Sequence, residues 1–478
     1  MEKPNGIRTR LQPLPEENIM AILDLIGVKD QHDIEDDKLT FLSAVRAISI
    51  VPQVAQVPTR KMYEAVFQIL QDNRSLELTI TSYQLLQDLE KCFPRVSIAK
   101  VEGLSSTDTE TQLVINSEVW SPFGVSLEND STEMEGHLST DDDYIDFSKL
   151  LSSTQDIVNH VCDGDPMYLG KGPELNVRSK QLTDDIMSKM MMFQYLVTLL
   201  RMDFISRCQV FKSNQKWPII RNSFLNQLLG SQRANFKNLV KNLMRIVAAT
   251  TREDSAMDLD TEHNSDCIPH KPLQKPDLAD TEFRHTLSQS VETLLTLVME
   301  LDTLKKEANQ NRWTSRSDGS RTPVLEIVID ELSYNKELIS PYLQGTVEAK
   351  WKTNIILTFF SKHCPRSIKM FERNIDESTI IDIFNCFSNV TNVRIISKRM
   401  GEDVIQLLLV HGFQAYFSLQ QGTCSLSHVK DNAEGETLLK ETCKSFITSF
   451  RNLKRVYKEL ELVAGGREAL FTAATIMS

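Results

Sequence analysis

The spacing of apolar residues between about 183 and 211 constrains the fold more than any other feature of this sequence. Apolar side chains recur there at intervals of four and three residues, at Ile186, Met190, Phe193, Val197, Leu200 and Phe204. Met191, Tyr195 and Leu199 place further apolar side chains on other faces of the same segment. This pattern is typical of an α-helix that is buried on several sides, as in the middle of a bundle or a stacked helical array.

The same helical spacing recurs along most of the chain. It is strong again between about 281 and 306, and Gly (17) and Pro (16) are too scarce to interrupt such helices often. The periodicity predicts further helices at about 39–50, 60–70, 75–92, 323–333, 336–344, 348–362, 376–388, 402–419, 435–460 and 466–476. We therefore expect an all-α fold, an α-solenoid of armadillo or HEAT type. No fixed period of about 34 or 40 residues is present, so its repeats are expected to be degenerate.

Two acidic segments interrupt the helical pattern. Residues 103–141 are rich in Ser, Thr and acids and poor in apolar side chains, which predicts a mobile acidic insertion. Within it, Val119–Phe123 is expected to dock on the helical body through its aromatic rings. Residues 250–280 have the composition of a disordered linker. The predicted parts are an N-terminal helical half at 1–249, the linker at 250–280 and a C-terminal helical half at 281–478.

The net charge of −12 is concentrated in these segments, since residues 101–150 carry −11 and residues 251–282 carry −6. The helical body is therefore mildly basic. Two basic stripes of helical spacing are candidate phosphate-facing surfaces, one with Arg233, Lys237, Lys241 and Arg245, the other with Lys444, Arg451, Arg455 and Lys458. The simpler reading is that these side chains face solvent. No aromatic residues interleave with them, so base stacking is not indicated.

The search for catalytic and metal-binding motifs finds none with the required spacing. His263, Cys267 and His270 lack a fourth ligand at structural-zinc spacing, and adjacent residues such as His363 and Cys364 diverge on a helix. The eight scattered cysteines form no Cys-x-x-Cys pair and are expected to be free thiols. No signal core and no membrane-spanning apolar run are found. We expect a non-enzyme without metal or cofactor.

The polar loop Ser315–Pro323 allows two readings. Arg316 and Arg321, together with the start of the next helix, would suit an anion. The favoured alternative is structural: Asp318–Gly319 turns the chain, Thr322 caps the helix and Pro323 takes its first position.

Several segments, in order along nearly the whole chain, carry a family resemblance. They are Asp37–Ala47, Lys61–Tyr63, Trp120–Phe123, Ser223–Asn226, Asn235–Lys237, Met299–Thr303, Thr314–Pro323, Asp330–Leu332 and Leu470–Ala473. Together they resemble the plant family of negative regulators of systemic acquired resistance. The densest match is Thr314–Pro323. The resemblance brings no catalytic residues and no DNA-binding motif.

The resemblance implies an armadillo-like nuclear protein that represses plant defence genes. It also implies a non-SMC subunit of the SMC five/six complex, similar in role to the sixth non-SMC element and acting in the DNA damage response and homologous recombination. The implied partners are the fifth-element-like non-SMC subunit and the SMC subunits, with any DNA contact expected to be indirect. The alternative is a transcriptional corepressor that bridges DNA-binding transcription factors and chromatin.

Overall fold

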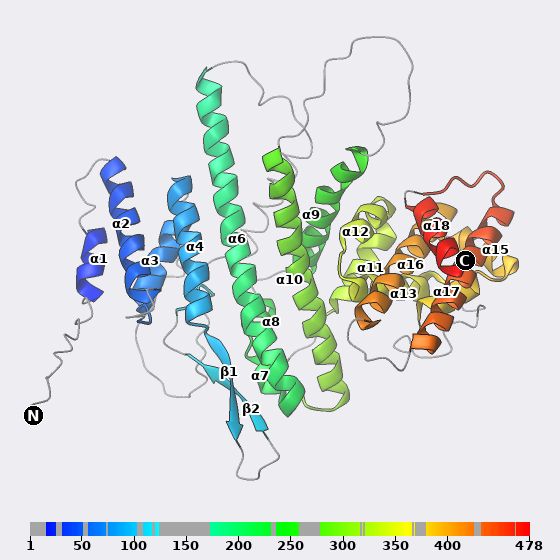
Figure 1. The fold of residues 1–478 in the computed structure, drawn as a ribbon, viewed down its shortest axis with the longest axis horizontal. Coiled ribbons are helices and arrows are strands. Elements are labelled where there is room, and N and C mark those ends of the chain that lie inside the picture. Colours follow the sequence, from blue (N-terminus) through cyan, green and yellow to red (C-terminus); the bar gives the residue numbers. More distant parts are fainter. Residues whose placement is uncertain are drawn as a thin grey trace, which may run out of the picture. The chain divides into compact units, whose positions relative to one another are not determined.

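The structure is a computed structural model in which the contacts divide the chain into two compact units, described here one at a time (Figure 1). Unit 1 comprises residues 1–234 and 305–319, and unit 2 comprises residues 235–304 and 320–478. The residues that the structure describes are 16–24, 31–50, 56–72, 75–102, 109–116, 120–123, 173–230, 236–257, 278–315, 318, 321–365, 368, 379–424, 432–463 and 465–478.

Unit 1 is a succession of helices with one β-hairpin. Its elements are α1 (Glu16–Asp24), α2 (Gln31–Ser49), α3 (Arg60–Gln71), α4 (Leu76–Cys92), β1 (Val96–Glu102), β2 (Thr109–Ile115), α6 (Pro173–Asn214), α7 (Trp217–Arg221) and α8 (Phe224–Gly230). Each helix from α1 to α4 packs against the next, and α6 packs against α3, α4, α7 and α8. Most residues of the predicted apolar spacing lie in the core of unit 1, with Phe193 and Leu200 fully buried, whereas Ile186 is only half-buried.

Helix α3 shows how the sequence sets local structure in this unit. Thr59 is its N-cap and accepts a hydrogen bond from the backbone N–H of Met62 at 3.4 Å. Tyr63, Val66 and Leu70 follow at intervals of three and four and are all fully buried. The cap and the apolar face therefore agree with the helix expected there.

The hairpin of β1 and β2 differs from the expectation that residues 103–141 are mobile apart from the aromatic anchor. The strands pair antiparallel, from Val96 opposite Ile115 to Glu102 opposite Thr109. The segment 109–115 (TETQLVI) ends in three apolar residues, two of them β-branched, and it can pair with the strand just before it. The prediction gave too much weight to the acids and hydroxyls nearby. Most of the remaining insertion lies outside the described residues.

The aromatic anchor predicted at 119–123 is confirmed for its described part. The Trp120 ring lies 5.0 Å from the Phe67 ring of α3, measured between centroids. The Phe123 ring lies 5.6 Å from the Phe224 ring of α8. Such pairs add to the free energy gained by burial of the rings.

Unit 2 is helical in all of its described elements. These elements are α9 (Phe236–Met257), α10 (Leu278–Gln310, up to residue 304 in this unit), α11 (Val324–Tyr334), the 3₁₀ turn η4 (Lys336–Leu338), α12 (Ile339–Gly345), α13 (Ala349–His363), α14 (Ile380–Cys386), α15 (Val390–Met400), α16 (Glu402–Cys424), α17 (Asn432–Val456) and α18 (Gly466–Met477). Helix α16 packs against α12, α13, α14, α15, α17 and α18. Leu409 and Phe413, near its middle, are almost completely buried.

The boundaries of the units differ from the predicted division at 250–280. Helix α9 continues to Met257, and Thr250 and Thr251 are buried within it. Helix α10 begins at Leu278, and residues 258–277 lie outside the described part of the chain. Helices α9 and most of α10, on the two sides of the predicted linker, belong to the same unit.

The fold is all-α and solenoid-like, as the periodicity predicts, with the β1–β2 hairpin as the exception among the described residues. None of the described helices is both long enough and apolar enough to cross a membrane. Helices α1, α7, α8 and α15 lie outside every range that the periodicity predicted, and α9 was indicated only by the spacing of its basic residues.

Candidate functional site

The first basic stripe lies on α9 and is paired with acids of α11. The Lys241 Nζ atom lies 2.6 Å from the Glu331 Oε2 atom, and the Arg245 Nη2 atom lies 3.6 Å from Glu331 Oε1. Lys237 is exposed, whereas Arg233 lies outside the described residues. Because Glu331 is buried, Lys241 and Arg245 neutralise a charge inside unit 2. The structure therefore favours a structural role for this stripe over phosphate binding.

A neighbouring acid extends this ion-pair network. Asp330 contacts Lys362 of α13, and the pKa of Asp330 is lowered, first by its hydrogen bond from Lys362 and further by the charges of Lys237 and Lys241. Helices α9, α11 and α13 are thus connected by opposite charges, through buried Glu331 and half-buried Asp330 of α11.

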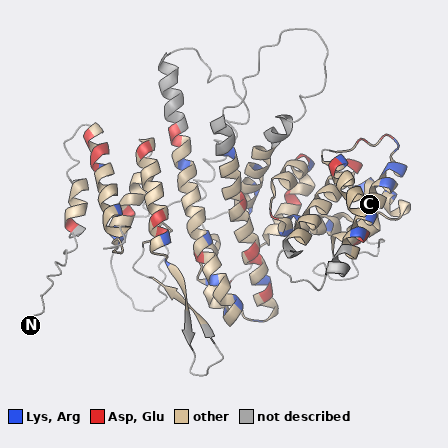
Figure 2. Cartoon of the chain, in the orientation of Figure 1, with Lys and Arg blue, Asp and Glu red and all other residues tan. Residues whose placement is uncertain are grey.

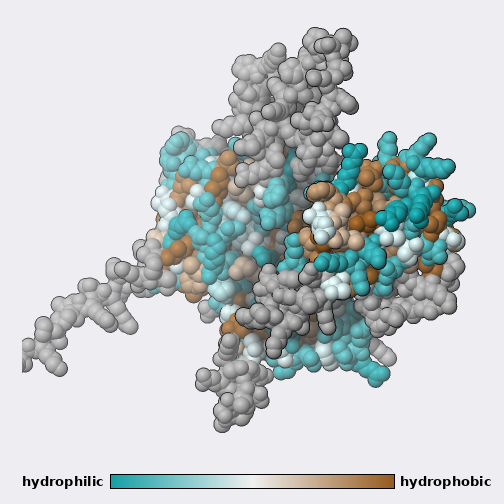
Figure 3. All heavy atoms as spheres, turned by 45° about the vertical axis from the view of Figure 1, so that its right-hand side comes forward, coloured by the Kyte–Doolittle hydropathy of each residue, from teal (hydrophilic) through white to brown (hydrophobic). Residues whose placement is uncertain are grey.

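The second basic stripe is exposed. Lys444, Arg451 and Arg455 lie on the outer side of α17, and Lys458 lies in the turn after the helix, because α17 ends at Val456 and not near 460 as predicted. Its buried side includes Phe446 and Phe450. In the space-filling view, hydrophilic residues gather at the upper right, with hydrophobic residues between and below them (Figure 3).

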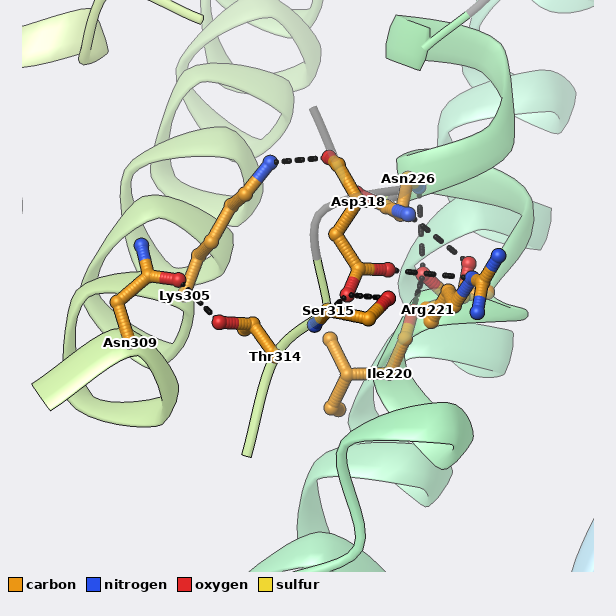
Figure 4. A network of polar contacts seen from close by, with 9 residues as sticks. Ile220, Arg221, Asn226, Lys305, Asn309, Thr314, Ser315 and Asp318 are labelled. Atoms are coloured by element: carbon orange, nitrogen blue, oxygen red, sulfur yellow. Dashed lines mark hydrogen bonds and ion pairs between the residues drawn. The ribbon is translucent and has the colours of Figure 1, made fainter. Parts of the chain in front are cut away.

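The polar loop after α10 is fixed by Asp318 (Figure 4). The Asp318 carboxylate accepts hydrogen bonds from the N–H of Ser315 at 2.6 Å and from its hydroxyl at 2.9 Å. Arg221 Nε lies 3.1 Å from Asp318 Oδ1, and Lys305 Nζ donates to the Asp318 carbonyl at 2.9 Å. Burial acts to raise the pKa of Asp318, but the donors to its carboxylate outweigh it and lower the pKa. The predicted turn at Asp318 is thus held on unit 1.

The start of α11 is capped differently from the prediction. Pro323, and not Thr322, occupies the N-cap position, and it provides no side-chain cap. Instead, the Asp302 carboxylate of α10 accepts a hydrogen bond from the N–H of Val324 at 2.7 Å. The same carboxylate accepts one from Arg321 Nε at 3.1 Å. Arg321 is therefore engaged with a carboxylate, and the anion-binding reading of the loop loses one of its two arginines.

A serine and a histidine meet in unit 2, a contact that the sequence does not reveal. Ser333 Oγ lies 2.7 Å from His363 Nε2, and the Ser333 hydroxyl donates its proton to the Ile329 carbonyl. The direction of the Ser333–His363 bond depends on the tautomer of the His363 ring. Burial lowers the pKa of His363 and raises that of Cys364, which favours the neutral imidazole and the neutral thiol.

Unit 1 contains a cavity of 270 Å³ lined by residues that include Glu90, Arg95, Arg201 and Asp203. Arg95 Nη2 lies 2.8 Å from Glu90 Oε1, and both side chains are 4% exposed. Burial acts to raise the pKa of Glu90, and Arg95 acts to lower it. The wall charges of Glu90 and Arg95 therefore pair with each other.

A second buried ion pair lies on α6. Arg207 Nε lies 2.7 Å from Asp203 Oδ1, the Asp203 carboxylate also accepts from the N–H of Phe224 at 2.9 Å, and Arg207 donates to the Ile219 carbonyl at 3.1 Å. The two side chains are only 1% and 2% exposed. The sequence signal was an acid and a base four residues apart within an apolar helix. It was missed because apolar spacing dominated the interpretation.

No group of three metal-ligating side chains is found among the residues that the structure describes. The candidates His263, Cys267 and His270 lie outside that part of the chain. Cys364 and Cys443 are free and buried, in agreement with the predicted free thiols.

The chain matches known proteins over nearly its whole length. Residues 95–347 match the SNI1 middle domain, and residues 364–478 match the SNI1 C-terminal domain. The chain is 34% identical over 467 residues to the negative regulator of systemic acquired resistance SNI1 of Arabidopsis thaliana, covering 97% of this chain and 94% of the relative. No solved structure matches. With two domains of one family in order and this identity over both full lengths, the chain belongs to the SNI1 family.

Proposed function

We propose that this chain is a negative regulator of systemic acquired resistance that works through protein partners. The observation that carries the proposal is the 34% identity over 97% of the chain to a relative of that name. The matches to the SNI1 middle domain at 95–347 and to the SNI1 C-terminal domain at 364–478 support the proposal.

The chemistry of the described side chains supports a non-enzymatic role. Glu90 and Arg95 in the wall of the unit 1 cavity pair with each other, and the Ser333 hydroxyl donates to the Ile329 carbonyl. A stacked helical array instead offers long outer faces for binding other proteins.

The finer form of the proposal is a nuclear scaffold within the SMC five/six complex. There the chain pairs with a fifth-element-like non-SMC subunit, acts in the DNA damage response and homologous recombination, and represses defence genes as a consequence. The segments that resemble the family, from Asp37–Ala47 to Leu470–Ala473, occur in the family's order along the sequence and support this assignment. The competing form is a corepressor that bridges transcription factors and chromatin.

A crosslinking pull-down from plant nuclei tests the two forms. The tagged full chain is recovered, its partners are quantified by mass spectrometry, and the tag alone serves as the control. Recovery of SMC five/six subunits in near-equal amounts is the expected result. Recovery of transcription factors and histone-modifying enzymes without SMC subunits would overturn the scaffold form and favour the corepressor.

A further inference from the structure

The exposed cations of α15 and α17 lie on two helices that pack against each other, and together they are here called the C-terminal basic surface. Its members are Arg394, Lys398 and Arg399 on α15, Lys444, Arg451, Lys454 and Arg455 on α17, and Lys458 in the turn that follows. Figure 2 marks all Lys and Arg positions of the described chain in blue. Helix α15, which the periodicity did not predict, supplies three of the eight cations.

The two helices are fixed beside each other. The Asn452 side chain of α17 donates to the carbonyls of Phe387 and Ser388, at 2.9 and 2.7 Å, just before α15 begins. Val393 and Ile396 bury the inner side of α15, and α15 packs directly against α17. Seven of the eight cations are therefore carried by two packed helices, and Lys458 follows directly after α17.

Among the described residues, none of the eight cations of this surface forms an ion pair with a carboxylate. The stripe on α9 is the contrast, since Lys241 and Arg245 pair with Glu331. The residues 390–400 and 442–458 contain no Asp or Glu, so nothing on these segments opposes the positive potential.

The composition of the surface favours nucleic acid over protein. Protein interfaces have an apolar, charge-depleted centre, whereas the one large hydrophobic side chain exposed on α15 is Ile395, and none is exposed on α17 from Lys444 onward. No exposed aromatic side chain accompanies the cations of either helix, which points to the backbone and not to base stacking.

The length of the surface also suits a phosphate backbone. Lys444 and Arg455 are separated by about 16 Å along the axis of α17, at about 1.5 Å per residue. Duplex DNA carries about one negative charge per 1.7 Å of axis, so several phosphates fall within that distance. We propose that the C-terminal basic surface binds the phosphate backbone of duplex DNA without regard to sequence. The proposal does not rest on the proposed function, because it concerns the purified chain alone.

Fluorescence anisotropy with a labelled duplex of random sequence tests the proposal. The purified full chain is titrated into the duplex at several salt concentrations. In a triple variant, Lys444→Gln, Arg451→Gln and Lys454→Gln remove three exposed cations. We expect this variant to bind about tenfold more weakly or worse. The slope of log K against log salt should become shallower by about 0.9 for each phosphate that the variant no longer neutralises.

The matched control removes the same residue types from unit 1. Arg60→Gln, Lys61→Gln and Lys212→Gln change the net charge equally at exposed positions. This control should bind DNA within about twofold of the unmodified chain, and circular dichroism should show that both variants are folded. Equal loss of binding in both variants would mean that net charge alone acts, which would overturn the proposal. Labelled polyglutamate serves as a second probe. If it binds the unmodified chain as tightly as DNA does and does not bind the triple variant, the surface binds an acidic protein segment, and the proposal is overturned.

Discussion

Asp203 is the residue on which three helices of unit 1 depend. Its carboxylate pairs with Arg207 on α6 and accepts the N–H of Phe224 at the start of α8, while Arg207 reaches the Ile219 carbonyl of α7. A buried charge pair of this kind contributes little net stability compared with apolar side chains of the same size. Removal of one partner, however, leaves the other charge buried and unpaired.

We expect Asp203→Ala to lower the free energy of unfolding by about 3–5 kcal/mol, because Arg207 keeps its charge in a dry site. Urea denaturation followed by circular dichroism measures the change. Replacement of both partners, with Asp203→Leu and Arg207→Met, should recover most of the loss. Arg201→Ala, at an exposed position of the same helix, should cost no more than about 0.5 kcal/mol. A cost below about 1 kcal/mol for Asp203→Ala would contradict the assigned role.

At the scale of single residues, the sequence predicts burial better than it predicts polar partners. The apolar spacing places Phe193 and Leu200 in the core, and both are fully buried. It does not predict that Lys241 pairs with Glu331, because that pair joins helices 90 residues apart in sequence. The two basic stripes have the same helical spacing, and only tertiary contacts separate the paired stripe from the exposed one.

At the scale of elements, α12 comes very close to α9 through Gly345. A Cβ atom on Gly345 would lie 2.6 Å from Thr251 Oγ1 and 2.7 Å from Val247 Cγ1. Both neighbours are buried, and Thr251 donates to the Val247 carbonyl at 2.7 Å, so neither can easily move away. The absence of a side chain is what permits this approach of the two helices.

Gly345→Ala should therefore destabilise the protein by about 1–3 kcal/mol through overpacking. The matched control is Gly412→Ala in α16, where the nearest atom to the added Cβ lies at an ordinary 3.5 Å. There the better helix propensity of Ala should leave stability unchanged or raise it by up to about 1 kcal/mol. Thermal melting of the two variants gives the comparison. If Gly345→Ala melts no lower than Gly412→Ala, α9 and α12 are not held as closely as described.

The ends of helices and strands can be predicted only where the residues that fix them are close in sequence. Thr59 can be recognised as a helix cap from the sequence because it lies only three residues before Met62, whose backbone N–H donates to its side chain. The cap of α11 cannot be recognised in this way, since Asp302 lies 22 residues before Val324. The β-hairpin was missed because a strand needs a partner, and the pairing of Val96–Glu102 with Thr109–Ile115 is not a helical period. The cations of α15 were missed because the whole helix was missed.

At the scale of the whole molecule, each unit is discontinuous in sequence. Unit 1 takes residues 305–319 from beyond α9, and these supply Trp313 and Asp318. The Trp313 ring lies 5.9 Å from the Phe211 ring in an edge-on contact, and Asp318 holds Arg221. The division predicted from composition, at 250–280, follows the acidic segment and does not follow these contacts.

A fragment of residues 1–249, the predicted N-terminal half, should therefore be incomplete. We expect it to melt at least about 5 °C below a fusion in which a flexible Gly-Ser linker joins residues 1–234 to residues 305–319. Near-ultraviolet circular dichroism, which reports tryptophan packing, follows both melts. The control is the same fusion with Trp313→Ala and Asp318→Ala, which should melt no higher than the fragment. Equal melting of the fragment and the unmodified fusion would show that 305–319 is dispensable to unit 1.

The interleaved chain also sets an order of events on the ribosome. The 70 residues 235–304 are synthesised after the first part of unit 1 and before its last part. At roughly 5–20 residues per second, translation of that stretch takes about 4–14 s. During this time Phe211 of the nascent chain lacks its edge-on contact with Trp313, so a chaperone has seconds in which to bind before the unit is complete.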